Sequence, residues 1–116
     1  MHKPLQATVR QLANAAVIDL RGDIDGSSEQ TLGAAYAEAA QNRLANILLN
    51  FSGVEYINST GIALIVGVLA QARKAKQRVS TFGLSEHYTE IFQITRLADF
   101  MTIYPDEASA LQRSVN

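Results

Sequence analysis

Asn58-Ser59-Thr60-Gly61 is the stretch whose residue types and spacing most clearly allow chemistry. It precedes a long apolar segment, so we expect the two hydroxyls at the N-terminus of a helix. A hydroxyl there lies beside free backbone N–H groups and the positive end of the helix dipole. Helix N-termini tolerate anions, so phosphorylation would add about two negative charges without unfolding the domain.

The same four residues also have a purely structural interpretation. Asn and Ser are preferred N-cap residues, which stabilise a helix by about 1 kcal/mol through a bond to a free backbone N–H. Gly61 would then serve only to allow close packing. The local pattern leaves both interpretations open.

Residues 57–61 also resemble the G-x-S-x-G turn of serine hydrolases. Ile57 stands where the first glycine of that turn is needed. His87 is the only histidine after Ser59, and its neighbour Glu86 is the only acid between them. Those hydrolases place an acid and then a histidine after the serine, so this spacing does not favour a nucleophilic serine. We therefore expect a binding protein and not an enzyme, with no catalytic residues.

Two further groups of charged residues have the residue types of a binding site. Asp23 and Asp25 are two carboxylates without a third partner, which favours a solvated loop over a metal site. The cations Arg73, Lys74, Lys76 and Arg78 are expected to complement the C-terminal end of a helix dipole. No G-x-x-x-x-G-K-[ST] nucleotide loop is present. We expect neither a metal nor a cofactor.

The composition is that of a globular domain without an extended charged surface. The 116 residues are 47% hydrophobic and 18% charged, carry a net charge of −1 and include no cysteine. This balance does not indicate nucleic acid as a partner. The longest apolar run, residues 62–70, is shorter than the roughly 20 residues that span a bilayer. The first eleven residues lack the apolar core of a signal peptide. We expect a cytoplasmic protein with no direct membrane insertion.

Hydrophobic periodicity predicts an α/β fold in the order β-β-α-β-α-β-α-β-α. Ser27 or Ser28 is expected to cap the first helix. The alternation predicts a mixed, mostly parallel sheet covered by helices, with the loops after the second and third strands close together at one edge. Strands are expected at 7–12, 15–20, 46–51, 79–82 and 101–104, and helices after GDIDGSS to about 39, at 61–76 and 86–94, and from 105 to about 113.

Five segments in this order resemble a STAS domain, the fold of bacterial anti-sigma factor antagonists. They are the GDID segment at 22–25, LNFSGVEYI at 49–57, NSTG at 58–61, the strand before Gly83, and the F-x-x-x-x-L-x-x-F pattern at 92–100. The resemblance runs from about residue 6 to residue 112, so we expect one STAS domain over residues 1–116.

The resemblance implies a regulatory mechanism. In single-domain antagonists, the serine of a D-S-[ST]-G motif is phosphorylated by a serine kinase/anti-sigma factor of the GHKL type. The free antagonist binds this kinase, phosphorylation releases it, and a PP2C-type phosphatase resets the switch. By motif position the acceptor is Ser59. Its neighbourhood and partner surface are expected to comprise Asn58, Thr60, Gly61, Ala63, Asp23 and Asp25.

One residue departs from the family pattern. Asn58 replaces the usual aspartate before the acceptor, which keeps a helix cap but removes one negative charge. A second hypothesis is therefore a constitutive STAS subunit of a membrane lipid-transport ATPase complex, in which the turn is a fixed contact. The retained Ser59-Thr60 pair favours the switch.

Overall fold

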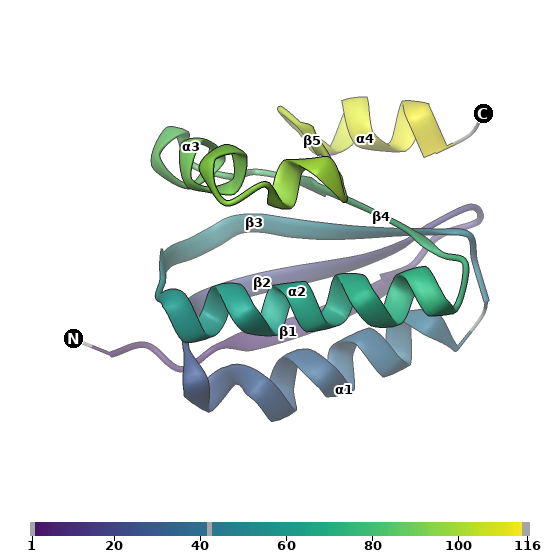
Figure 1. Ribbon diagram of the computed structural model, residues 1–116. Coiled ribbons are helices and arrows are strands. Elements are labelled where there is room, and N and C mark those ends of the chain that lie inside the picture. The colour runs from purple at the N-terminus through teal and green to yellow at the C-terminus, as the bar shows by residue number, and fades with distance from the viewer. Residues whose placement is uncertain (1, 42, 115–116) are drawn as a thin grey trace.

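The computed structural model describes residues 2–41 and 43–114. Figure 1 shows a layered α/β arrangement with the strands side by side. The strands are β1 (Gln6–Gln11), β2 (Ala16–Ile24), β3 (Asn46–Ile57), β4 (Arg78–Phe82) and β5 (Thr102–Tyr104). The helices are α1 (Glu29–Ala40), α2 (Ser59–Lys74), α3 (Glu86–Ile94) and α4 (Glu107–Ser114), with short 3₁₀ turns η1 (Gly26–Ser28) and η2 (Leu97–Asp99).

The sheet has five strands in the order β1-β2-β3-β4-β5. β1 and β2 form an antiparallel pair, and the other pairs are parallel. This confirms the predicted mixed, mostly parallel sheet and the predicted order of strands and α-helices. The two 3₁₀ turns were not predicted.

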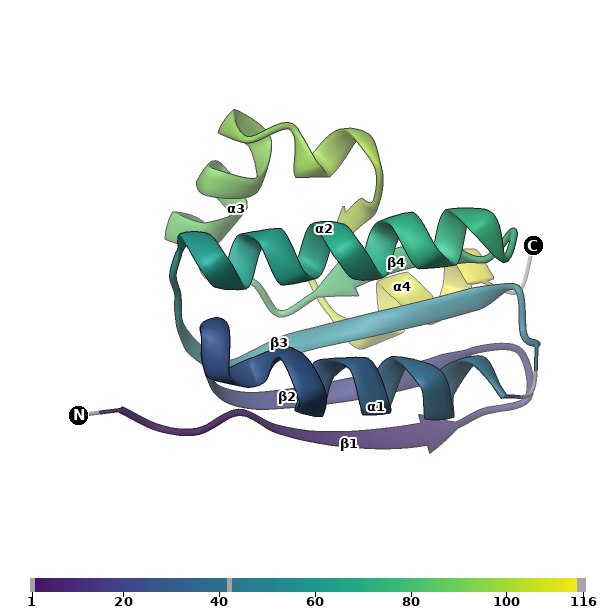
Figure 2. The same ribbon diagram turned by 60° about the horizontal axis from the view of Figure 1, so that its bottom comes forward.

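The main core lies between one face of the sheet and the helices. α1 and α2 lie along this face, and α3 follows at the carboxyl end of β4 (Figures 1 and 2). Ile47 and Leu49 of β3 point into this core, whereas Leu48 between them joins a second cluster with Ala110 of α4. All three are buried, which confirms the expectation of a strand covered on both faces.

α4 packs against the second face of the sheet. The small cluster under α4 occupies part of it, and a polar network lies beside that cluster. The Arg10 guanidinium donates to the carboxylates of Asp19 and Glu107, with shortest distances of 2.6 and 2.7 Å. Asn50 donates to Asp19 at 2.7 Å. These bonds connect the start of α4 to the sheet.

The predicted boundaries of β2 and β3 were wrong at the carboxyl ends. The sequence pattern predicts loops at residues 22–24 and 52–57, but these residues continue the strands. Arg21 pairs with Gly53 after one shift in register, and Ile24 pairs with Ile57 after a second. In these segments the backbone N–H and C=O groups find their partners across the two strands. Hydrophobic alternation alone does not predict such pairing.

The predicted start of the second helix and the predicted serine cap of the first helix also need correction. α2 begins at Ser59, two residues earlier than expected, and ends at Lys74. Ser28 precedes α1 but makes no capping bond to it. Its hydroxyl accepts from the Asp25 N–H at 3.0 Å and donates to the Asp23 carbonyl at 3.2 Å. The capping residue of this segment is Asp25, which precedes η1 and accepts from the Ser27 N–H.

Candidate functional site

The carboxyl ends of β2 and β3 meet at the N-terminus of α2. The Asn58 N–H donates to the Ile24 carbonyl at 3.1 Å, which joins the end of β2 to the turn that starts α2. A Cβ placed on Gly26 would be 3.5 Å from Cγ2 of Thr60, so η1 also lies against this turn. Figure 2 shows η1 and the first turn of α2 at the same edge of the sheet. The predicted proximity of these two loops is confirmed.

Asn58 caps α2. Its Oδ1 accepts a hydrogen bond from the Gly61 N–H at 2.8 Å, and its own backbone is extended. The Asn58 carbonyl accepts the first helical bond, from the Ile62 N–H at 2.9 Å. The cap is therefore made by Asn58, so the hydroxyl of Ser59 is not needed for it.

Ser59 is exposed, and so are Thr60 and Ala63. Over residues 2–41 and 43–114, no hydrogen bond involves the Ser59 hydroxyl. Ser59 thus presents its hydroxyl at the start of a 16-residue helix without an intramolecular role for it. The hydroxyl is therefore accessible from solvent.

Gly61 fixes how closely α2 approaches β2. It is buried, and a Cβ at this position would collide with the Ile24 carbonyl oxygen. The close packing suggested by the sequence is confirmed. The absence of a side chain at Gly61 lets the helix start directly against the end of the strand.

Tyr88 of α3 hydrogen-bonds Ile57, the last residue of β3 before the turn. Tyr88 was not identified from the sequence. Its hydroxyl accepts a hydrogen bond from the Ile57 N–H at 2.8 Å, in a buried environment. α3 is itself capped by Ser85, whose hydroxyl accepts from the Tyr88 N–H at 3.2 Å. The signal available in the sequence was the loop GLSEHY, which follows the next parallel strand and so reaches the same edge.

Asp23 and Asp25 form a separate acidic pocket beside the turn. With His2, Glu55 and Tyr56 they line a space of about 450 Å³, and Ser59 is not among its lining residues. Asp23 is buried and accepts from the Lys3 N–H at 3.1 Å. The structure thus places the two aspartates near the turn but orients Asp23 toward the N-terminal segment.

Asp25 is held in its ionised form by local hydrogen bonds. The Ser27 hydroxyl donates to Asp25 Oδ1 at 2.6 Å and the Ser27 N–H donates at 2.9 Å. His2 Nδ1 lies 3.2 Å from Oδ2. These contacts, the Ser27 hydroxyl foremost, lower the pKa of Asp25 from its usual value.

The described residues form neither a metal cluster nor a membrane-spanning helix. Among residues 2–41 and 43–114, no cluster brings together three or more His, Cys, Asp or Glu side chains that could bind a metal ion. Within the same part of the chain, no helix combines the length and apolarity needed to cross a bilayer.

The chain has known relatives. The family described as "Mlab, STAS domain" matches residues 7–104. The anti-sigma-B factor antagonist of Staphylococcus aureus (strain NCTC 8325 / PS 47) is 27% identical over 86 residues, which cover 74% of this chain and 80% of that protein.

Two solved structures share the fold over nearly the whole chain. An anti-sigma factor antagonist from Mycobacterium paratuberculosis has a TM-score of 0.84 at 17% identity, with both chains fully covered. The Bacillus cell fate determinant SpoIIAA in its phosphorylated form has a TM-score of 0.70 at 22% identity, with 92% of this chain and 97% of that chain covered. At such identities the structures establish the fold. Because the family match spans most of the sequence, the chain belongs to the STAS domain family.

Proposed function

We propose that this protein is a cytoplasmic anti-sigma factor antagonist that changes partners when Ser59 is phosphorylated. The observation that carries the proposal is the exposed Ser59 hydroxyl, unbonded within the described chain, at the start of a helix capped by its neighbour Asn58. The curated relative carries the name anti-sigma-B factor antagonist, which supports the same class. The unphosphorylated form binds a GHKL-type serine kinase/anti-sigma factor, and a PP2C-type phosphatase reverses the modification.

The local geometry accommodates a phosphate. The N–H of Gly61 is bonded by the Asn58 side chain and the N–H of Ile62 by the Asn58 carbonyl. The first two helical N–H groups, of Ser59 and Thr60, have no partner within the described chain. They and the helix dipole stabilise an anion at this position. The fold therefore tolerates the modification that a switch requires.

The same phosphate opposes docking of a partner. Ala63 lies one turn after Ser59 and is also exposed, so a partner chain can approach this part of α2 closely. A phosphate enclosed in such a contact without a counter-charge costs several kcal/mol. Each 1.4 kcal/mol changes affinity about tenfold, so the cost is sufficient for release.

Asn58 is proposed to retain the capping role of the family's aspartate while removing a charge next to the acceptor. Asp23 and Asp25 supply acidic groups near the turn, although each has its own hydrogen-bond partners. The acidic surroundings of the acceptor are thus weaker than in a D-S-[ST]-G turn.

The decisive experiment is an affinity capture with defined variants and mass spectrometry of the captured proteins. The baits are wild type, Ser59→Ala, Ser59→Glu and the matched control Gln71→Glu, which adds the same charge at an exposed position farther along α2. We expect a GHKL-type kinase with every bait except Ser59→Glu. Retention by Ser59→Glu, or a phosphopeptide map that places phosphate only at other residues, would contradict the proposal.

The docking surface has a separate test. Ala63→Lys introduces a long cation beside Ser59 on an exposed helical position, so it should preserve the fold and weaken kinase binding. Unchanged affinity, measured with a folded variant, would exclude Ala63 from the contact.

A constitutive subunit of a lipid-transport ATPase complex is the second candidate. The observation that favours it is Asn58, an uncharged residue that caps α2 where the antagonist motif has an acid. In this case transport ATPase subunits would be captured equally by all four baits, and Ser59 would be a fixed contact.

A further inference from the structure

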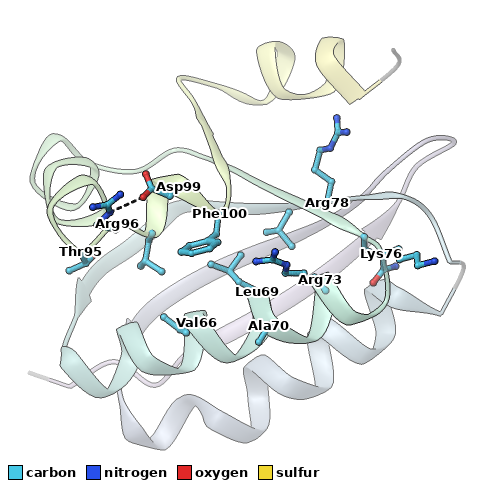
Figure 3. Close-up of a pocket in the computed structure, with 14 residues that line it drawn as sticks. Val66, Leu69, Ala70, Arg73, Lys76, Arg78, Thr95, Arg96, Asp99 and Phe100 are labelled. Atoms are coloured by element: carbon cyan, nitrogen blue, oxygen red, sulfur yellow. Dashed lines mark hydrogen bonds and ion pairs between the residues drawn. The ribbon is translucent and has the colours of Figure 1, made fainter.

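A second groove lies at the opposite end of α2 from Ser59. Its volume is about 980 Å³, and it lies between the C-terminal half of α2, the start of β4 and the segment around η2 (Figure 3). At about 1.5 Å per residue, Arg73 is about 21 Å from Ser59 along the helix. The groove is therefore a separate surface from the turn that carries the proposed function.

The groove has an apolar floor and an apolar rim. Leu69, Val79 and Leu97 line it and are buried, whereas Val66 is 47% and Phe100 61% exposed. Figure 3 shows the Phe100 ring and the Leu69 side chain in the centre of the groove. An exposed aromatic ring beside an apolar floor is an arrangement that a partner side chain can cover favourably.

The remaining lining side chains give the groove a positive charge. Four cations, Arg73, Lys76, Arg78 and Arg96, line it together with a single carboxylate, Asp99. Asp99 pairs with Arg96 at 2.8 Å, and the other three cations form no ion pair within residues 2–41 and 43–114. The whole chain carries a net charge of −1, so this positive surface is local.

Helix termination explains only part of this cluster. Lys76 and Arg96 end α2 and α3 in left-handed conformations, with φ of 60° and 66°. Arg43 does the same after α1, outside the groove. Glycine is the residue best suited to such positions. In α2 the cations Arg73 and Lys74 of the last turn already complement the helix dipole. The positive charges of Lys76 and Arg96 are therefore not needed to end the two helices.

We propose that this groove binds an acidic segment of a partner protein, in which one or two apolar anchors are flanked by Asp or Glu residues. The positions of the cations favour a peptide with several carboxylates over a ligand with a single anionic group. Figure 3 shows Arg96 near one end of the groove and Lys76 and Arg78 toward the other. A ligand with one anionic head group can approach only one of these ends. A peptide with several carboxylates reaches both while its anchors contact Phe100 and Val66.

Fluorescence polarisation with synthetic peptides tests the proposal. One labelled peptide carries Leu at helical i, i+3 and i+4 spacing with Asp and Glu between, and its counterpart carries Lys at the acidic positions. We expect saturable binding of the acidic peptide alone, weakening with added salt. Backbone amide shifts in ¹⁵N-labelled protein should change around the groove.

Matched variants locate the binding. Arg73 and Lys74 are adjacent exposed cations in the last turn of α2, but only Arg73 lines the groove. Arg73→Glu should weaken peptide binding about tenfold or more, with little effect from Lys74→Glu. Phe100→Ala should also weaken binding, because it removes the apolar contact. Circular dichroism would verify that each variant is folded.

Four outcomes would overturn the proposal. The first is the absence of saturable peptide binding, and the second is an equal loss of peptide affinity in Arg73→Glu and Lys74→Glu. The third is a loss of peptide binding in Ser59→Glu. The fourth is that the protein captures phosphatidylglycerol vesicles but not the peptide. Equal losses would indicate unspecific attraction, and vesicle capture would indicate a membrane surface. Peptide binding that survives Ser59→Glu would support a groove independent of the proposed switch, so the two proposals can fail separately.

Discussion

Gly61 lies directly against the carbonyl oxygen of Ile24, with no room for a side chain between them. This contact joins the end of β2 to the start of α2, and the Asn58 N–H donates to the same carbonyl. The position of the exposed Ser59 thus depends on a glycine two residues later.

Gly61→Ala should lower the free energy of unfolding by about 1–3 kcal/mol, because the added methyl group displaces α2 from Ile24. Gly67→Ala is the matched control, since Gly67 lies in the same helix with nothing within 4 Å of a Cβ. It should stabilise the protein by about 0.5–1 kcal/mol through helix propensity. Urea denaturation would measure both, and equal effects would contradict the packing role of Gly61.

Tyr88→Phe should cost about 1–3 kcal/mol, because the buried Ile57 N–H loses the oxygen to which it donates. Tyr56→Phe is the control, since Tyr56 is 52% exposed and should change stability little. Thermal denaturation would compare the two. A loss of amide exchange protection at Ile57 in Tyr88→Phe would show that the turn has loosened. Unchanged protection there would argue against a supporting role for Tyr88.

Asn58→Ala should destabilise the protein by about 1 kcal/mol through loss of the bond from the Gly61 N–H. Asn58→Asp should retain wild-type stability or exceed it, because a carboxylate caps equally well and interacts favourably with the helix dipole. Chemical denaturation at low ionic strength would compare the variants. If Asn58→Asp destabilised the protein as much as Asn58→Ala, the cap would depend on the amide group. The proposed equivalence with the aspartate of the family motif would then be wrong.

Asp19 should make stability fall in acid. The pKa of Asp19 is lowered from its usual value, first by hydrogen bonds from Arg10 and also by one from Asn50. The unfolded chain then binds more protons than the native protein, so this contribution is present above the unfolded pKa of about 3.9 and is lost as pH falls through the native value.

The measurement is urea unfolding between about pH 5 and pH 3. Asp19→Asn should be less stable than wild type at neutral pH but should lose less stability over this interval. Glu38→Gln removes an exposed carboxylate and should follow wild type. Parallel pH profiles for wild type and Asp19→Asn would rule out the contribution of Asp19.

Local sequence patterns were sufficient for much of the fold. The apolar run at residues 46–51 identified a strand buried on both faces, and the helical period of residues 86–94 gave the bounds of α3. The polar turn before α2 was recognisable because capping depends on neighbouring residues. Asn58 and Ser59 could therefore be placed at a helix N-terminus from the sequence, and the exposure of Ser59 agrees with that placement.

Contacts between distant segments were decided only by the tertiary structure. The length of β3 depends on its pairing with β2, and the support of Ile57 by Tyr88 joins residues 31 positions apart. The groove brings together the end of α2, the start of β4 and the segment around η2. Hydrophobic periodicity reports which face of an element is buried, whereas strand register and helix packing set what that face meets. For this reason the sequence indicated the capped turn, and the structure revealed its support and the second groove.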